Sequence, residues 1–170
     1  MRFIRILLQC IGALALIVVA GVAVYAFMSF SGPKKSTDKD DALFVLNWGG
    51  FSTTQNWTVI DGSVSARDIT GDHTDYYCIQ LEDVSVTEPM LIEWQTGPET
   101  NDLLAAALEQ SLQWAEYEGA DCFPSFEMAN SQQMKIMFWG MNTHGRVPAG
   151  AQVLLLQPST KRLFYVSFAT

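Results

Sequence analysis

The apolar positions of the chain fall into two parts with different patterns. Residues Ile6 to Phe30 form a run of 25 positions without a charged side chain, in which Gln9 and Ser29 are the clearly polar members. A helix rises about 1.5 Å per residue and the hydrocarbon core of a bilayer is about 30 Å thick, so about 20 such residues can cross it. The pattern predicts a transmembrane helix within residues 1–31.

A cleaved signal peptide is the alternative interpretation of this segment. Arg2 and Arg5 provide a charged start, and Val24-Tyr25-Ala26 resembles a cleavage site. The apolar run is nearly twice as long as that of a signal peptide, which favours an uncleaved signal anchor. We expect the N-terminus inside a bacterial-type inner membrane and the C-terminal part on the extracytoplasmic side. Three lysines after the run nearly balance the positive charges before it, so the orientation rests mainly on the resemblance to an export signal.

Beyond this run the pattern changes to that of a water-soluble domain. Residues 32–42 are polar and show no apolar periodicity, which predicts a short linker. Residues 43–170 mix apolar and polar positions throughout, and a chain of that length can bury a core without a metal or a dense disulfide framework. We therefore expect one globular domain over residues 43–170.

Alternating or short apolar runs predict that most of this domain is sheet. Residues 43–47 alternate weakly, and a bulge is expected at Glu82-Asp83. Pro158 to Lys161 predicts a tight turn between the last two strands, which would form an antiparallel hairpin. The expected strands cover residues 57–66, 75–86, 90–95, 134–141, 152–157 and 162–168.

One segment of the domain has helical periodicity. Leu104, Leu108 and Leu112 recur at a spacing of four between Asp102 and Glu118, which predicts an amphipathic helix with an acidic outer face. Asn101 or Asp102 can cap its start, and Gly119 stands where a left-handed residue would end it. Strands, one helix and further strands predict an α+β domain, a mostly antiparallel sheet with one covering helix.

The charge of the chain disfavours one class of partner. The formal net charge is −8, and because Arg2 and Arg5 precede every acidic residue, the exposed part carries about −10. From Asp68 to Met134 there are 14 carboxylates and no Lys or Arg. Such a surface repels phosphate backbones, so nucleic-acid binding is disfavoured. A cationic protein or ion is the expected partner, although solubility alone also explains a negative charge.

Two segments are candidates for binding a partner. Several carboxylates lie on or just after the predicted helix, and the polar, glycine-containing segment 142–150 predicts a loop between two strong strands. That loop is equally consistent with an ordinary connection. The candidate partner-binding residues are Glu109, Glu116, Glu118, Asp121, His144 and Arg146.

The cysteines carry information about the compartment. Cys10 lies in the apolar run, which leaves Cys78 and Cys122 as an even pair in the domain. Their pairing is expected if the domain lies in an oxidising compartment. Two buried free thiols are the alternative, because free cysteine is among the most buried residue types.

Asp68, Asp72 and Asp75 are a candidate cation site. They lie with His73 inside eight residues, and carboxylate oxygens suit calcium or magnesium. The spacing is not that of an EF-hand, and aspartate and glycine also serve the backbone bonding of turns. We expect no resident cofactor, with a divalent cation as the alternative.

No catalytic signature is found. The chain lacks the Gly-x-Ser-x-Gly, His-Glu-x-x-His, Cys-x-x-Cys and phosphate-loop motifs, and His73 and His144 are its only histidines. The sequence therefore favours a membrane-anchored binding or accessory protein, in a sharper version an immunity or inhibitor factor. The alternatives are a small envelope hydrolase or metal-dependent enzyme that uses one of the histidines, and a structural subunit of an envelope complex.

Overall fold

The computed structural model describes residues 2–30, 34–65, 67, 71–87 and 92–170, without the side chains of 2–10 and 26–30. The chain divides into two compact units, Met1–Gly32 and Pro33–Thr170.

The described residues of the first unit form helix α1 (Arg2–Phe30). A helix over the apolar run is thus confirmed. Across the described residues, which in α1 include the side chains of positions 11–25 alone, no helix has both the length and the apolar character that crossing a bilayer requires.

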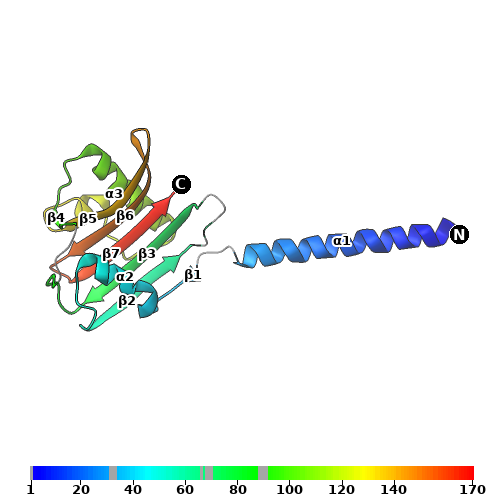
Figure 1. The fold of residues 1–170 in the computed structure, drawn as a ribbon, viewed down its shortest axis with the longest axis horizontal. Helices are drawn as coiled ribbons and strands as arrows, with labels where there is room; N and C mark the ends of the chain where they lie inside the picture. The colour runs from blue at the N-terminus through cyan, green and yellow to red at the C-terminus, as the bar shows by residue number, and fades with distance from the viewer. Residues whose placement is uncertain (1, 31–33, 66, 68–70, 88–91) are drawn as a thin grey trace. The chain divides into compact units, whose positions relative to one another are not determined.

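The second unit is built on one antiparallel sheet of seven strands (Figure 1). Their order is β1-β2-β3-β7-β6-β5-β4, so the three C-terminal strands form a meander between β3 and the short β4. The predicted α+β class with a mostly antiparallel sheet is confirmed. The strands are β1 (Lys34–Lys35), β2 (Trp57–Val64), β3 (His73–Leu81), β4 (Gln95–Thr96), β5 (Lys135–His144), β6 (Val147–Gln157) and β7 (Arg162–Ala169).

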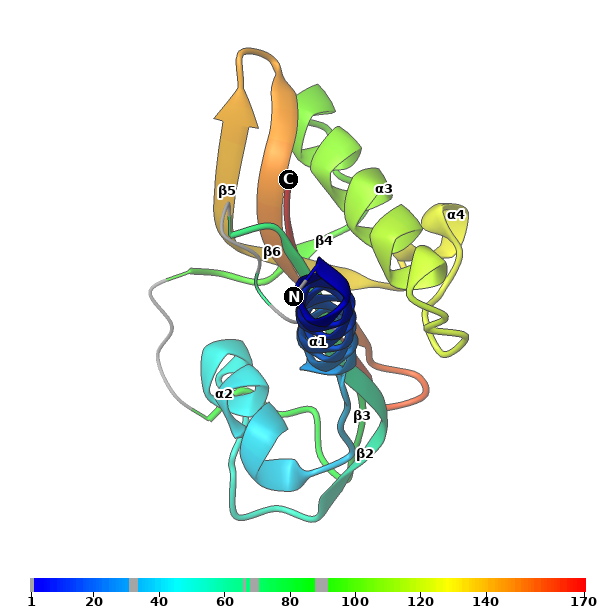
Figure 2. The ribbon, with the colours of Figure 1, turned by 90° about the vertical axis from the view of Figure 1, so that its right-hand side faces the viewer.

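Both faces of the sheet are covered, so the unit has two cores. Alternate residues of a strand point to opposite faces. On β3, Tyr76 and Cys78 belong to the core under helix α3 (Asp102–Tyr117), whereas Tyr77 and Ile79 belong to the core under helix α2 (Lys39–Gly49). Figure 2 shows the two helices on opposite sides of the sheet. The central strands β3 and β7 are therefore almost wholly buried.

Helix α3 agrees closely with its prediction. The Asn101 side chain accepts hydrogen bonds from the backbone N–H groups of Leu103 and Leu104, at 3.0 and 3.2 Å. Gly119 adopts a left-handed φ of 79° just after the helix. The short helix α4 (Phe126–Ala129) follows it and is capped by Ser125.

Helix α2 corrects two predictions, the weak strand over 43–47 and the linker over 32–42. Asp38 caps its first turn by accepting a hydrogen bond from the backbone N–H of Asp40 at 3.0 Å, and Gly50 ends it with a φ of 72°. Ala42, Val45, Leu46 and Gly49 are its buried residues, a helical spacing of three and four. The short apolar run alone is compatible with a strand or a helix. Its capping residues, and a sheet face that needs a cover, favour the helix.

The segment 142–150 is also corrected. It is a hairpin and not a loop, because β5 extends to His144 and β6 begins at Val147. The bulges lie in β2 between Val59 and Asp61 and in β5 after Phe138 and Asn142, not at Glu82-Asp83. Of the predicted strand 90–95, positions 90 and 91 lie outside the described residues and only Gln95 is in a strand.

Candidate functional site

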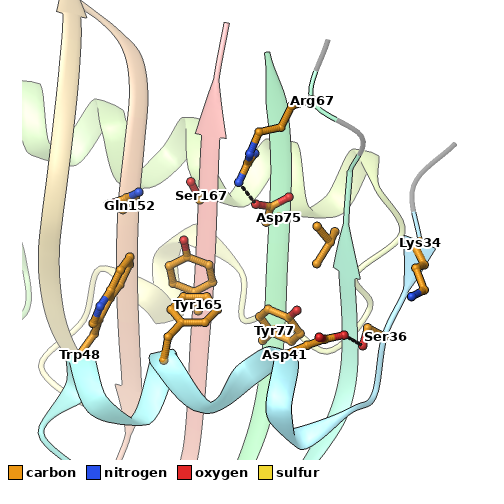
Figure 3. A pocket seen from close by; sticks show the side chains of 12 residues that line it. Lys34, Ser36, Asp41, Trp48, Arg67, Asp75, Tyr77, Gln152, Tyr165 and Ser167 are labelled. Carbon is orange, nitrogen blue, oxygen red and sulfur yellow. Dashed lines mark hydrogen bonds and ion pairs between the residues drawn. The ribbon is translucent and has the colours of Figure 1, made fainter. Parts of the chain in front are cut away.

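A cavity of about 470 Å³ lies between α2 and the sheet face beneath it (Figure 3). Its size is typical of small-ligand sites in proteins. Its walls come from α2, β1, β2, β3, β6 and β7 and from Arg67 after β2, segments that are far apart in the sequence. The lining residues are Lys34, Ser36, Asp41, Phe44, Trp48, Val64, Arg67, Asp75, Tyr77, Gln152, Tyr165 and Ser167.

One wall of the cavity is aromatic. Phe44 and Trp48 lie one helical turn apart on α2, and their ring centroids are 4.9 Å apart in an edge-to-face arrangement. Phe44 also packs edge-to-face on Tyr165 at 5.1 Å, and Trp48 stacks on Trp139 at 4.9 Å. Edge-to-face pairs add to the stability gained from burial, so these rings hold α2 in place over the sheet.

A row of polar side chains crosses the sheet at the other end of the cavity. Asp75 of β3, Ser167 of β7 and Gln152 of β6 are register partners on adjacent strands. They occupy the face that α2 covers only in part, and Figure 3 shows them side by side above the rings. The strand register therefore brings these three residues together from distant segments of the sequence.

Asp75 is the buried charge of the site. Its side chain accepts a hydrogen bond from the Arg67 guanidinium at 2.9 Å, and from the Ser65 backbone N–H at 3.1 Å. The side chain of Asp75 is 9% exposed and that of Arg67 is 55% exposed. A buried carboxylate is tolerated when it is paired in this way, and the exposed guanidinium retains further N–H groups for other acceptors.

The start of α2 and strand β1 form another part of the lining. The Ser36 hydroxyl donates to the Asp41 carboxylate at 2.5 Å, and the Ser36 backbone N–H donates to the Gly62 carbonyl at 2.9 Å. Gly62 is needed there, because a Cβ would lie 2.5 Å from the Ser36 carbonyl oxygen and 2.5 Å from the Tyr77 ring. Lys34 lines the cavity without a partner among the described residues.

Two tyrosines of the cavity keep their protons well into the alkaline range. Burial raises the pKa of Tyr77 to about 12, and the charges of Asp41 and Asp75 add to the shift. Burial also raises the pKa of Tyr165 to about 12, with hydrogen bonding to Ser167 acting in the opposite direction. Both hydroxyls therefore remain hydrogen-bond donors at neutral pH.

We expect the free energy of unfolding to be largest below about pH 10 and to fall as the pH rises towards 12. An unfolded tyrosine loses its proton near pH 10, whereas Tyr77 and Tyr165 hold theirs to about pH 12 in the folded state. The unfolded state then binds fewer protons, so rising pH favours it. Urea unfolding at about pH 9 and about pH 11 measures the effect. Tyr165→Phe should reduce it, with Tyr117→Phe on α3 as the matched control. Equal stability at both pH values would contradict the assignment.

A second cavity, of about 250 Å³, continues from this row and is lined by His73, Asn142, Gln152 and Ser167 among others. His73 Nδ1 lies 2.8 Å from the Gly71 carbonyl oxygen, and His73 Nε2 lies 3.0 Å from Ser167 Oγ. Because a carbonyl oxygen only accepts, Nδ1 carries the proton, and for a neutral ring Ser167 donates to Nε2. The pair joins β3 to β7. The hydrolase alternative that uses His73 stays a prediction.

Two of the predicted partner-binding carboxylates share a groove. Glu109 and Glu116 of α3 line a cavity of about 420 Å³ together with Glu127 of α4. Hydrogen bonds from the backbone N–H of Glu127 and from the Ser125 hydroxyl hold the pKa of Glu127 below its usual range. We call this cavity the acidic groove. Its other lining residues are Leu112, Gln113, Ala120, Phe123, Pro124, Ser125 and Phe126.

The remaining predicted partner-binding residues lie elsewhere. Glu118 caps the end of α3 and Asp121 follows it, and neither lines the acidic groove. Both add to the raised pKa of Tyr76, about 12, of which burial is the largest cause and Asp61 the next. His144 and Arg146 are exposed at the tip of the β5–β6 hairpin. The structure therefore brings together two of the six.

The predicted cation ligands are not gathered into a site in the part of the chain that the structure describes. Asp68 lies outside the described residues, and Asp75 is on a strand, paired with Arg67. Among the described residues, no three His, Cys, Asp or Glu side chains are placed to hold a metal ion.

The predicted pairing of Cys78 with Cys122 is confirmed. The bond links β3 to the segment between α3 and α4 across 44 residues. Cys78 is fully buried under α3, and Phe123 packs beside the bond on Tyr76 and Phe164. The disulfide thus fixes the segment that forms one side of the acidic groove.

Sequence reasoning missed the cavity under α2. Two features of the sequence pointed to it: Phe44 and Trp48 at a spacing of four, and the polar Ser167 within the apolar strand β7. Only the strand register shows that these residues line the same cavity. The assembled arrangement offers binding surfaces on both faces of the sheet, aromatic and polar on one and acidic on the other. Comparison with known protein families, with curated proteins and with solved structures found no match for this chain.

Proposed function

We propose that this chain is a membrane-anchored, extracytoplasmic binding protein that captures a basic segment of a protein partner in the acidic groove. The observation that carries the proposal is the groove itself. Three carboxylates, Glu109, Glu116 and Glu127, line it together with the apolar side chains of Leu112, Phe123 and Phe126.

The chemistry of the groove matches lysine and arginine side chains better than other classes of ligand. These side chains combine a long apolar stem with a charged end, so the stem can pack on the apolar lining residues while the charge contacts a carboxylate. The sequence has no Lys or Arg between Asp68 and Met134, and both α3 and α4 lie inside that range. The segment that forms the groove therefore supplies no cation of its own to neutralise it.

Membrane anchoring is supported by helix α1 and by the uncharged sequence that this helix spans. The uncharged residues from Ile6 to Phe30 all lie within this helix of 29 residues. At about 1.5 Å per residue, such a run exceeds the thickness of about 30 Å of a hydrocarbon core.

The disulfide supports the extracytoplasmic side of the proposal. Bonds of this kind form and persist in oxidising compartments, whereas cytosolic reductants keep most thiols reduced. The Cys78–Cys122 bond lies inside the Pro33–Thr170 unit, so this unit is the part expected to face the oxidising side.

We expect the full-length protein in detergent micelles to bind a fluorescently labelled arginine-rich peptide, and Glu116→Gln to weaken that binding about fivefold. The removed contact is a partly exposed charge pair, which contributes about 1 kcal/mol. Raised salt should weaken binding further, because screening acts on exposed charges. Fluorescence anisotropy at low and physiological salt measures both effects.

Glu93→Gln is the matched control, because it removes one exposed carboxylate that does not line the acidic groove. If Glu93→Gln weakens the peptide as much as Glu116→Gln, attraction by net charge replaces the groove as the explanation. Binding that does not change with salt would overturn the proposal.

A further inference from the structure

The cavity under α2 is a separate site from the acidic groove. It lies on the opposite face of the sheet, and the two sites share no lining residue. It also carries two of the eight cations of residues 33–170, Lys34 and Arg67, in a unit that is otherwise strongly acidic. Its ligand therefore need not resemble a basic peptide.

The two carboxylates of this cavity are already engaged. Asp75 accepts hydrogen bonds from Arg67 and from both the backbone N–H and the hydroxyl of Ser65. Asp41 accepts one from Ser36 at 2.5 Å. A cationic ligand would compete with these internal donors for the same carboxylates.

The hydrogen-bond donors of the cavity, by contrast, can still bind a ligand. Lys34 has no partner among the described residues, and Arg67 uses one nitrogen on Asp75. The hydroxyl of Tyr77 stays protonated. An anion with two oxygen acceptors can use such donors, and charge-assisted hydrogen bonds are the strong ones.

The aromatic side chains of the cavity indicate which apolar group the ligand carries. Phe44, Trp48 and Tyr165 meet edge-to-face at 4.9 to 5.9 Å and present a rigid aromatic wall beside these donors. A flat apolar group packs well against such a wall. A space of about 470 Å³ lies in the range of small-ligand sites and has room for one or two rings.

We propose that the cavity under α2 binds a small aromatic carboxylate, whose carboxylate contacts Lys34 and Arg67 and whose ring packs on Phe44, Trp48 and Tyr165. The same chemistry occurs in a free aromatic acid and at the C-terminus of a peptide that ends in an aromatic residue. This site is independent of capture by the acidic groove.

Isothermal titration of the full-length protein in detergent micelles tests the proposal. The probes are indole-3-acetate and a tripeptide that ends in phenylalanine with a free carboxylate, each compared with its uncharged amide. We expect at least one acid to bind about tenfold more tightly than its amide, as one charge-assisted contact provides. Preference for the free acid or for the peptide identifies the source of the ligand.

The variants separate this site from net charge. Lys34→Gln should weaken the acid about tenfold and leave the amide unchanged, whereas Phe44→Ala should weaken both. Lys35→Gln is the matched control, because Lys35 is the next residue of β1, carries the same charge and does not line the cavity. Arg67→Gln should act like Lys34→Gln, but it leaves Asp75 without its ion pair, so Lys34→Gln is the primary test.

Equal affinity for acid and amide would overturn the assignment of the carboxylate. Absence of binding by both acids at millimolar concentration would overturn the site. An equal effect of Lys35→Gln and Lys34→Gln would show a general charge effect and would also contradict the proposal. Loss of peptide capture by the acidic groove variants has no bearing on these outcomes, because the two sites share no lining residue.

Discussion

Replacing Cys78 and Cys122 together by alanine is expected to lower the free energy of unfolding of the Pro33–Thr170 unit by about 4 kcal/mol. The bond closes a loop across 44 residues, so its removal returns conformational freedom to the unfolded chain. It also releases Phe123, whose ring packs on Tyr76 and Phe164 at 6.0 and 5.4 Å. Both effects favour the unfolded state.

Urea unfolding of the full-length protein, followed by tryptophan fluorescence, measures this loss. All five tryptophans lie after residue 33, so the signal reports on the unit that contains the disulfide. Cys10→Ala is the matched control, because Cys10 belongs to the other unit. A double variant within about 1 kcal/mol of the wild type would contradict the expected role of the bond.

Phe164→Ala is expected to cost about 3 to 5 kcal/mol, the range for removing a large buried aromatic side chain. Phe164 is 1% exposed at the centre of β7 and lies opposite Cys78 on one side and Leu155 on the other. The cavity left behind would be enclosed by β3, β6 and the Phe123 ring, which the disulfide holds in place. The surroundings therefore have little freedom to collapse into it.

The same urea titration applies to this variant. Tyr117→Ala is its control, because that side chain is 79% exposed on α3 and its removal should change stability by at most about 0.5 kcal/mol. A loss below about 1 kcal/mol for Phe164→Ala would mean that the core under α3 repacks more readily than its packing indicates.

The elements that local patterns determine were predictable from the sequence. The α3 helix has a leucine every four residues, a capping Asn101 and a left-handed Gly119, so pattern, capping and breaker all agree. The strands β6 and β7 are rich in strand formers and are joined by a recognisable turn. In short apolar runs such as 43–47, the hydrophobic periodicity does not distinguish a strand from a helix. Tertiary packing determines the secondary structure there.

The cavity under α2 was not predictable for a different reason. Asp75, Ser167 and Gln152 become neighbours only through the order β3-β7-β6 and its register. Arg67 joins them through its ion pair with Asp75, a side chain that becomes buried only when the sheet forms. The acidic groove was partly predictable, because Glu109 and Glu116 already share a helix face, whereas Glu127 reaches it through the segment anchored by Cys122.

The alternation along β3 gives the disulfide a further consequence for folding. Cys78 faces the α3 side in the native alignment of β3 with β7, whereas a slip by one residue would turn every side chain to the opposite face. In such a slipped chain the Cys78 thiol would point away from Cys122, and oxidation could not close the loop. The covalent link therefore works as a check on strand alignment, since it locks only those molecules in which the two faces of the sheet have been assigned correctly.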